Sequence, residues 1–200
     1  VLRFGNPPFT GAMISTWIAG KAAWLEAQWS DPEWRPLRKI SPHLRRSVLA
    51  GEDQRFTIHR GFDFVELNRA FQEVLSGHRV RGASTISMQT ARTVFLWSGR
   101  SLARKSLEVY YTVLIELLWS KKRILEVYLN TVDWGKHVVG ADMASKKYFQ
   151  TQASSLTAEQ AALLAAVLPS PHQWSAEHPT EYVLERQKRI LSDLRKMPLL

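Results

Sequence analysis

Apolar residues recur at intervals of three and four positions through most of this chain, which is the spacing of an α-helix and not the alternation of a β-strand. Ser41-Pro42, Asp63 with Glu66, Ser101, and Thr157 with Gln160 are typical helix starts. Strand signals are few. The pattern predicts about eight helices in one all-α domain. We expect them from 41, over 63–77, 84–95 and 101–119, from 120, and over 141–149, 161–168 and 180–196, and residues 13–29 show a looser helical periodicity.

Charge and cysteine content narrow the classes of partner and chemistry. The 200 residues hold 27 Lys and Arg against 18 Asp and Glu, a net charge of +9. This balance favours an anionic partner: nucleic acid, an anionic membrane surface or a phosphorylated substrate. Cysteine is absent, which excludes a disulfide framework, a thiolate zinc site and cysteine catalysis. The uncharged run 4–20 contains prolines and glycines and would not span a bilayer as a helix.

Two carboxylates stand out by their setting. Glu52 follows an apolar stretch and precedes Phe56, so we expect it at the inner end of a helix. Glu108 lies in the helix over 101–119, which is apolar on most sides and is therefore expected to be buried on most sides. A carboxylate there costs free energy unless it is paired or used. Two acids in unlike environments suit glycosyl chemistry. The alternatives are a helix-terminal surface acid for Glu52 and a salt bridge to Arg104 for Glu108.

A group of cations surrounds the helix that begins at Gly82-Ala83-Ser84-Thr85. Its members are Arg79, Arg81, Arg92, Arg100, Arg104 and Lys105. A helix N-terminus and forked guanidinium groups bind phosphate oxygens well, although a solvated basic surface would have the same composition. The six histidines show no metal-ligand spacing, and we expect His59 to be a packed or surface residue. Walker-type and dinucleotide-binding glycine motifs are absent from the sequence.

Five ordered segments between residues 50 and 171 form a specific pattern. They are 52–63 (Glu-Asp-x-x-Phe-x-x-His-x-Gly-x-Asp), 82–89 (Gly-x-Ser-Thr-Ile-x-x-Gln), 104–108 (Arg-Lys-x-x-Glu), 121–130 and 148–165. This pattern resembles the peptidoglycan glycosyltransferases, glycosyltransferase family 51. The segments 7–10 and 95–101 resemble the monofunctional biosynthetic branch of Gram-negative bacteria, which normally carries one N-terminal membrane helix.

The resemblance implies that the chain polymerises lipid II into glycan strands. The growing chain is the donor, and the 4-hydroxyl of an incoming lipid II displaces undecaprenyl pyrophosphate with inversion to a β-1,4 link. By match, Glu52 is the general base, Asp53 assists its placement, and Glu108 stabilises the leaving pyrophosphate. The donor side is implied to be bound by Ser84, Thr85, Gln89, Arg92, Arg100, Arg104 and Lys105. No cofactor is implied as obligatory, and a divalent cation (Mg²⁺ or Mn²⁺) near Glu108 stays open.

The sequence departs from the family pattern at three positions. Met88 stands where the first Gln of a pair is usual, Arg92 where Lys is usual, and Thr93 where Asn is usual. Arginine keeps the charge of lysine but changes its geometry. Met88 removes an amide, so a donor-side hydrogen bond is missing or is supplied by water. Because Met88 and Ser84 lie one helical turn apart, we expect both to project towards the donor cleft.

The resemblance further implies a lysozyme-like fold, with a larger globular lobe that holds both acids and a smaller membrane-proximal jaw lobe from residues around Arg79 to Gly99. We expect a membrane-proximal segment over 1–40, with the anchor helix upstream of it missing, and a glycosyltransferase domain over 41–200. Two interpretations, packing in the core and contact with a membrane interface, both stay open for Trp17, Trp24, Trp29 and Trp34.

The implied location is the periplasmic face of the bacterial inner membrane, with a single-pass N-terminal anchor absent from this chain. The implied partners are lipid II, the growing glycan strand, an anionic membrane surface, the inhibitor moenomycin and other cell-wall synthesis or division proteins, and not nucleic acid. Two other classes stay open. A lysozyme-like lytic or hydrolytic enzyme would share the fold without needing the cations. A non-catalytic membrane or nucleic-acid binding module would explain the charge but not the two acids.

Overall fold

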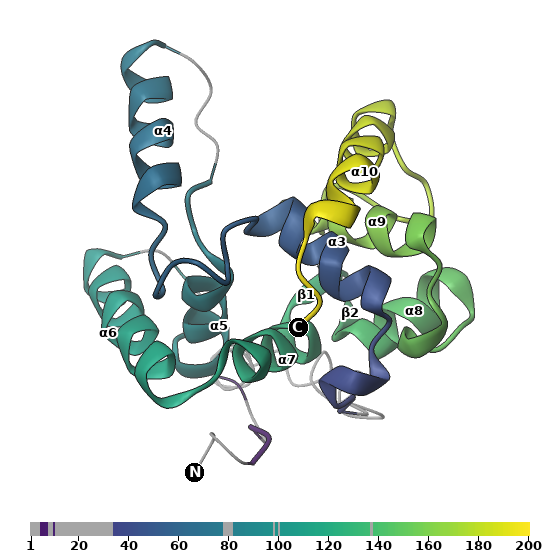
Figure 1. The fold of residues 1–200 in the computed structure, drawn as a ribbon, viewed down its shortest axis with the longest axis horizontal. Coiled ribbons are helices and arrows are strands. Elements are labelled where there is room, and N and C mark those ends of the chain that lie inside the picture. The colour runs from purple at the N-terminus through teal and green to yellow at the C-terminus, as the bar shows by residue number, and fades with distance from the viewer. Residues whose placement is uncertain are drawn as a thin grey trace.

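A computed structural model describes residues 5–7, 10, 34–77, 82–97, 99, 101–136 and 138–200. Most of the described chain is helical, as the apolar spacing predicts (Figure 1). The α-helices are α3 (Pro42–Glu52), α4 (Phe64–Leu75), α5 (Ile86–Phe95), α6 (Leu102–Leu118), α7 (Lys121–Thr131), α8 (Ala141–Phe149), α9 (Ala158–Val167) and α10 (Glu181–Asp193). Short 3₁₀ turns lie at η1 (Leu37–Lys39), η2 (Ala153–Ser155) and η3 (Leu194–Lys196).

One short antiparallel ladder interrupts the helices. Strand β1 (Asp133–Gly135) pairs with β2 (Val138–Val139), with Asp133 opposite Val139 and Gly135 opposite Val138. The sequence predicts only a loop between Gly135 and Gly140, because so short a ladder carries no alternating pattern. The described part of the chain is otherwise without strands, so the predicted all-α class is confirmed.

Local side-chain caps fix most helix starts where the sequence places them. The Ser101 side chain accepts a hydrogen bond from the Arg104 N–H, and the Asp63 side chain accepts from the N–H groups of Val65 and Glu66. Thr157 and Gln160 form the predicted reciprocal capping box. These bonds satisfy N–H groups that a helix start otherwise leaves unpaired, which is why a few residues suffice to position each start.

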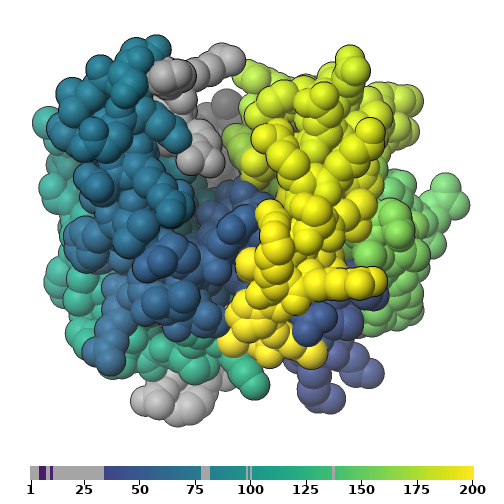
Figure 2. All heavy atoms as spheres, turned by 45° about the horizontal axis from the view of Figure 1, so that its top comes forward, coloured from purple at the N-terminus to yellow at the C-terminus, as the bar shows by residue number. Residues whose placement is uncertain are grey.

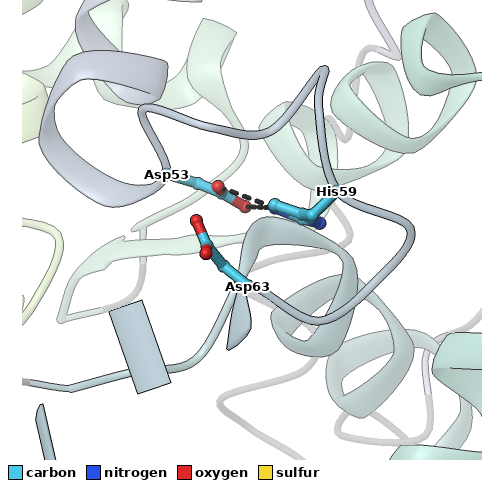
Figure 3. A group of neighbouring side chains, drawn as sticks. All are labelled: Asp53, His59 and Asp63. Carbon is cyan, nitrogen blue, oxygen red and sulfur yellow. Dashed lines mark hydrogen bonds and ion pairs between the residues drawn. The ribbon is translucent and has the colours of Figure 1, made fainter. Parts of the chain in front are cut away.

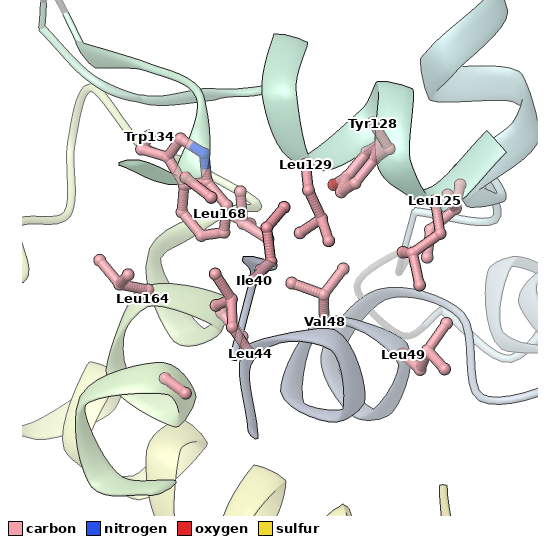
Figure 4. Close-up of a cluster of buried hydrophobic side chains, with 14 of the residues drawn as sticks. Ile40, Leu44, Val48, Leu49, Leu125, Tyr128, Leu129, Trp134, Leu164 and Leu168 are labelled. Carbon is pink, nitrogen blue, oxygen red and sulfur yellow. The ribbon is translucent and has the colours of Figure 1, made fainter. Parts of the chain in front are cut away.

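The hydrophobic core joins α3, α7 and α9 (Figure 4). Leu44 and Val48 of α3 and Leu129 of α7 are fully buried, and Leu164 brings α9 into the same cluster. Trp134, which follows α7, is also buried. Helix α10 packs on α9 and α3, whereas α5 packs on α6 and α7. The last residues of α3 therefore lie between two groups of helices, one carrying α10 and the other carrying α5 and α6.

Helix α6 differs from its prediction. Its buried residues are Arg104, Glu108, Thr112 and Ile115, one stripe at intervals of three and four. The apolar side chains of Leu102, Tyr110, Leu117 and Leu118 are more than half exposed. The expectation that this helix is buried on most sides is wrong, because hydrophobic content does not tell which stripe faces the protein.

Helix α4 projects from the body of the molecule (Figure 1). It lies wholly within the described part, and none of its residues is buried. Phe64 and Leu75 are each about 70% exposed. Residues 86–95, in the range predicted for a jaw, form α5, which has a buried face, and the jaw lobe itself stays a prediction. Most of the large exposed apolar residues in the described ranges thus lie on α4 and α6.

Membrane features predicted for the N-terminal segment fall mostly on residues that are not described. The looser helical periodicity over 13–29 and Trp17, Trp24 and Trp29 lie outside the described residues. Trp34 is described, and the Arg123 guanidinium lies 5.2 Å from the centre of its ring. None of the helices in the described ranges has both the length and the apolar character that crossing a membrane needs.

Candidate active site

Glu52 ends α3, and its carboxylate is held by side chains from two other helices. Gln89 of α5 donates from Nε2 to Oε2 at 3.1 Å, and Arg186 of α10 donates from Nη2 to Oε1 at 3.2 Å. The side chain is 10% exposed. Burial raises the pKa of Glu52 above its usual value, while Gln89 and Arg186 oppose the rise. Glu52 is therefore a partly desolvated carboxylate with two fixed donors, and the alternative of a solvated surface acid is wrong.

Asp53 joins the end of α3 to the start of α5. Its carboxylate accepts a hydrogen bond, 2.9 Å long, from the N–H of Ile86, which is the first residue of α5. His59 Nε2 lies 2.9 and 3.1 Å from the two carboxylate oxygens (Figure 3). Thr85 caps α5 by accepting the Met88 N–H and donates to the Gly61 carbonyl at 2.6 Å. These bonds fix the helix that carries Gln89 relative to Glu52, which fits the supporting role predicted for Asp53.

Tyr128 extends the network into the core. Its hydroxyl donates to Gln89 Oε1 at 3.3 Å. Burial and the nearby Glu52 hold the pKa of Tyr128 well above its usual value, and Arg92 opposes this. At pH 7 the phenol is therefore a neutral donor, which leaves the Gln89 amide N–H free to face Glu52. Arg92 is thus near Tyr128, on the same helix as Gln89.

Glu108 lies on α6, in the buried polar stripe. Lys105 Nζ is 2.5 Å from Oε1 and Arg104 Nη1 is 3.4 Å from Oε2. The Glu108 side chain is 1% exposed and that of Arg104 10%. The salt bridge to Arg104 that the sequence leaves open is present. Because α6 packs on α5, the helix of Glu108 neighbours the helix of Gln89 and Arg92. The role of Glu108 toward substrate stays a prediction.

The other predicted donor-side residues occupy different settings. Ser84 is half-buried in the extended segment before α5, and its carbonyl lies 3.5 Å from Gln89 Nε2. Met88 is 8% exposed, so its side chain faces protein and not open solvent. Arg92 is half-buried. Arg100, together with Arg79 and Arg81, lies outside the described residues. The structure thus brings Glu52, Asp53, Thr85 and Gln89 together around the start of α5.

Two groups of side chains contain the atom types that bind metal ions. Oxygen and nitrogen atoms of Asp53, His59 and Asp63 lie within 4.8 Å of one another, the one such cluster among the described residues (Figure 3). Asp63 already accepts two N–H groups on Oδ1 and faces Arg55 Nε at 3.0 Å with Oδ2, and Asp53 is likewise occupied. The hydrogen bonds and ion pair already made by these side chains favour a supporting role over a cation site. At Glu108, both oxygens face cationic side chains, which is a poor fit for a divalent cation.

Sequence reasoning missed Arg186 and gave no role to Tyr128. Tyr128 lies in the matched segment 121–130 and in an apolar helical stripe, so its position was visible but its hydroxyl was not given a function. Arg186 is one of several cations on an amphipathic helix, and nothing local separates it from its neighbours. Its contact with Glu52 arises only through tertiary structure.

Comparison with known proteins places this chain in a family. The family model described as Transglycosylase matches residues 20–195. The chain is 48% identical to the "Biosynthetic peptidoglycan transglycosylase" of Pseudomonas syringae pv. syringae, over 98% of this chain and 83% of that protein. It is 48% identical to the protein of the same name from Caulobacter vibrioides, over 94% and 79%, and 44% identical to that from Chromohalobacter salexigens, over 98% and 85%.

Proposed function

The chain belongs to the transglycosylase family, and from this premise we propose that it is a peptidoglycan glycosyltransferase that polymerises lipid II. The observation that carries the proposal is the setting of Glu52. A carboxylate whose pKa is raised by burial, and which two donors hold in place, suits a general base that must be ionised yet accept a proton. Relatives named as biosynthetic peptidoglycan transglycosylases support the substrate class.

In the proposed reaction, Glu52 accepts the proton of the 4-hydroxyl of the incoming lipid II. The oxygen of that hydroxyl attacks the anomeric carbon of the growing chain, and the bond from this carbon to undecaprenyl pyrophosphate breaks. The pyrophosphate leaves with the bonding electrons. Because the hydroxyl oxygen attacks from the face opposite the pyrophosphate, the anomeric centre inverts and a β-1,4 link forms. Asp53 acts indirectly, since it holds the start of α5 and thereby Gln89.

Cations on α5 and α6 are proposed to stabilise the departing pyrophosphate. Arg92 lies on α5, and Arg104 and Lys105 lie on the first turn of α6. Fixed positive charge placed where negative charge develops lowers the barrier without reorganisation during the reaction. Glu108 anchors Arg104 and Lys105 at the distances given above, so it orients two of these cations. Arg100 is proposed for the same role from the family match alone.

The exposed apolar faces of α4 and α6 are proposed to rest on the membrane, on its periplasmic side. A groove of about 660 Å³ is lined by Phe64, Leu67, Phe71 and Val74 of α4 together with Gly82 and Ala83. Figure 2 shows α4 in blue and α10 in yellow on opposite sides of this face of the molecule, with the chain after α3 between them. Large exposed apolar patches mark membrane or ligand contact, and both fit a substrate with a polyprenyl tail.

The decisive experiment is turnover of labelled lipid II by the purified chain, with products sized on a gel. We expect glycan polymers from the wild-type chain and none from Glu52→Gln, whose amide cannot take the acceptor proton. Moenomycin is expected to compete with the lipid-linked donor. The lysozyme-like alternative is tested in parallel with preformed peptidoglycan. Release of soluble fragments from that substrate without polymer from lipid II would overturn the proposal.

A further inference from the structure

Arg186 holds the proposed general base from a helix that lies outside all five sequence segments of the family pattern. Its Nη2 atom donates to the Gly51 carbonyl at 2.7 Å and to Glu52 Oε1 at 3.2 Å. One guanidinium nitrogen thus bridges the carbonyl of the penultimate residue of α3 and the carboxylate of the last residue of that helix. The Arg186 side chain is 21% exposed, well shielded for an arginine on a surface helix.

Close contact between α10 and α3 makes this bridge possible. Helix α10 packs on both α9 and α3. At Gly51, an added Cβ would lie 3.1 Å from Ile190 Cδ1 and 3.6 Å from Arg186 Nη2. A larger residue at this position would therefore press on α10 beside the guanidinium. The absence of a side chain at Gly51 allows α10 to approach the catalytic end of α3 closely.

Arg186 is the cationic group among the charged surroundings of Glu52 in the described part of the chain. Among the described residues, the titratable groups that act on Glu52 are Asp53 next to it, Tyr128 from α7 and Arg186 from α10. The Asp53 charge disfavours an ionised Glu52, and Tyr128 is neutral at pH 7. Gln89 donates a hydrogen bond but carries no charge. Arg186 is therefore the cation in this group that favours the ionised carboxylate.

We propose that Arg186 is a positioning residue for the general base: its guanidinium fixes the orientation of the Glu52 carboxylate and keeps it ionised at the pH of the reaction. The proposal rests on the proposed function, because only a base for the acceptor hydroxyl needs this charge state. It also gives α10 a role. Docking of the C-terminal helix completes the site that α3 and α5 begin.

The test compares Arg186→Gln and Arg186→Lys with a matched control, Arg189→Gln. Arg189 lies on the same helix and is exposed, so its substitution removes the same charge without touching Glu52. The measurement is kcat/KM on lipid II between about pH 5 and pH 9. We expect Arg186→Gln to lose about 10- to 100-fold on the acidic side, where loss of the guanidinium leaves Glu52 protonated. The loss should shrink as the pH rises.

The other two variants separate positioning from a structural role. Arg186→Lys retains the charge and should recover most of the wild-type pH profile, with some loss of kcat because one point charge orients a carboxylate less well than a fork. Arg189→Gln should follow the wild-type profile throughout. A loss that is equal at every pH, or the same shift in the Arg189→Gln profile, would overturn the proposal.

A second measurement does not depend on turnover. Carboxyl-labelled glutamate gives a carbon resonance for Glu52, which is assigned by its disappearance in Glu52→Gln. Its titration should move to higher pH in Arg186→Gln and not in Arg189→Gln. If the wild-type chain fails to polymerise lipid II, the proposed function falls, yet this titration still decides the contact. An unmoved titration overturns the role of Arg186 whatever the chain polymerises.

Discussion

Glu108→Gln should destabilise the protein strongly, even though the substitution barely changes the shape of the side chain. The carboxylate is 1% exposed and lies between Arg104 and Lys105. With glutamine in its place, the Arg104 side chain, 10% exposed, keeps its charge and loses its carboxylate partner. An uncompensated charge in a desolvated site is the costly outcome, and the loss of the attraction itself is the smaller part.

The expected loss in the free energy of unfolding follows from the contacts of Glu108 with Arg104 and Lys105. Breaking a buried ion pair from one side costs about 3–5 kcal/mol. The Arg104 contact is long, at 3.4 Å, and Lys105 is 47% exposed, so its pair adds only about 0–1 kcal/mol. We therefore expect Glu108→Gln to lower the free energy of unfolding by about 3 kcal/mol in total. For a domain of this size each kcal/mol lowers Tm by about 2–4 °C, so Tm should fall by about 6–12 °C while the fold survives.

Thermal unfolding followed by circular dichroism measures this loss, and the double variant Arg104→Met/Glu108→Met is its control. Replacing both charges by apolar groups removes the stranded cation, so Tm should return to within about 3 °C of the wild type. Polymerisation should stay low in both variants if Glu108 orients cations toward the pyrophosphate. A Glu108→Gln protein that melts within about 2 °C of the wild type would refute the burial argument. A double variant that polymerises normally would reduce Glu108 to the partner of Arg104.

Three further predictions concern other parts of the fold. Met88→Gln places an amide at a position that is only 8% exposed, and an unpaired buried amide should lower Tm by about 2–12 °C. An unchanged Tm with a higher kcat/KM would show instead that the amide reaches the donor. At Asp142, burial is outweighed by Arg35, Lys146 and the Ala153 N–H, which hold the pKa below its usual value. This stabilisation is present above about pH 4 and is lost as the pH falls through the lowered pKa. In urea titrations, Asp142→Asn should therefore unfold more readily than the wild type at pH 7 and differ little from it at low pH. The double variant Leu67→Ser/Phe71→Ser changes two side chains that are 52% and 58% exposed, so Tm should not change. Its sedimentation with anionic vesicles should weaken at least about 10-fold, and sedimentation equal to that of the wild type would argue against membrane contact by α4.

The features that sequence predicted well are those that a few neighbouring residues determine. The start of α6 at Ser101 and of α9 at Thr157 each depend on a side chain that bonds an N–H three positions on. The setting of Glu52 was also accessible, since apolar residues lead into it and its segment matches a family pattern. The bridge from Arg186 was not, because 134 positions separate the two residues and no local pattern on α10 distinguishes Arg186 from Arg189. Contacts of this kind are set by how helices dock, which periodicity within one helix does not encode.

The error over α6 has a physical reason that bears on the proposed function. In water, a helix buries its apolar stripe and exposes its polar one. Helix α6 departs from this rule, since Glu108 and Arg104 face the protein while Leu102 and Leu117 are among its most exposed residues. The proposed function gives two reasons for this arrangement. The proposed reaction needs fixed charges beside a pyrophosphate, and the proposed membrane contact would give the outward apolar stripe an environment as favourable as a protein core. Under the proposed function, the polar stripe of α6 serves the site and its apolar stripe contacts lipid, a distinction that hydrophobic spacing alone does not record.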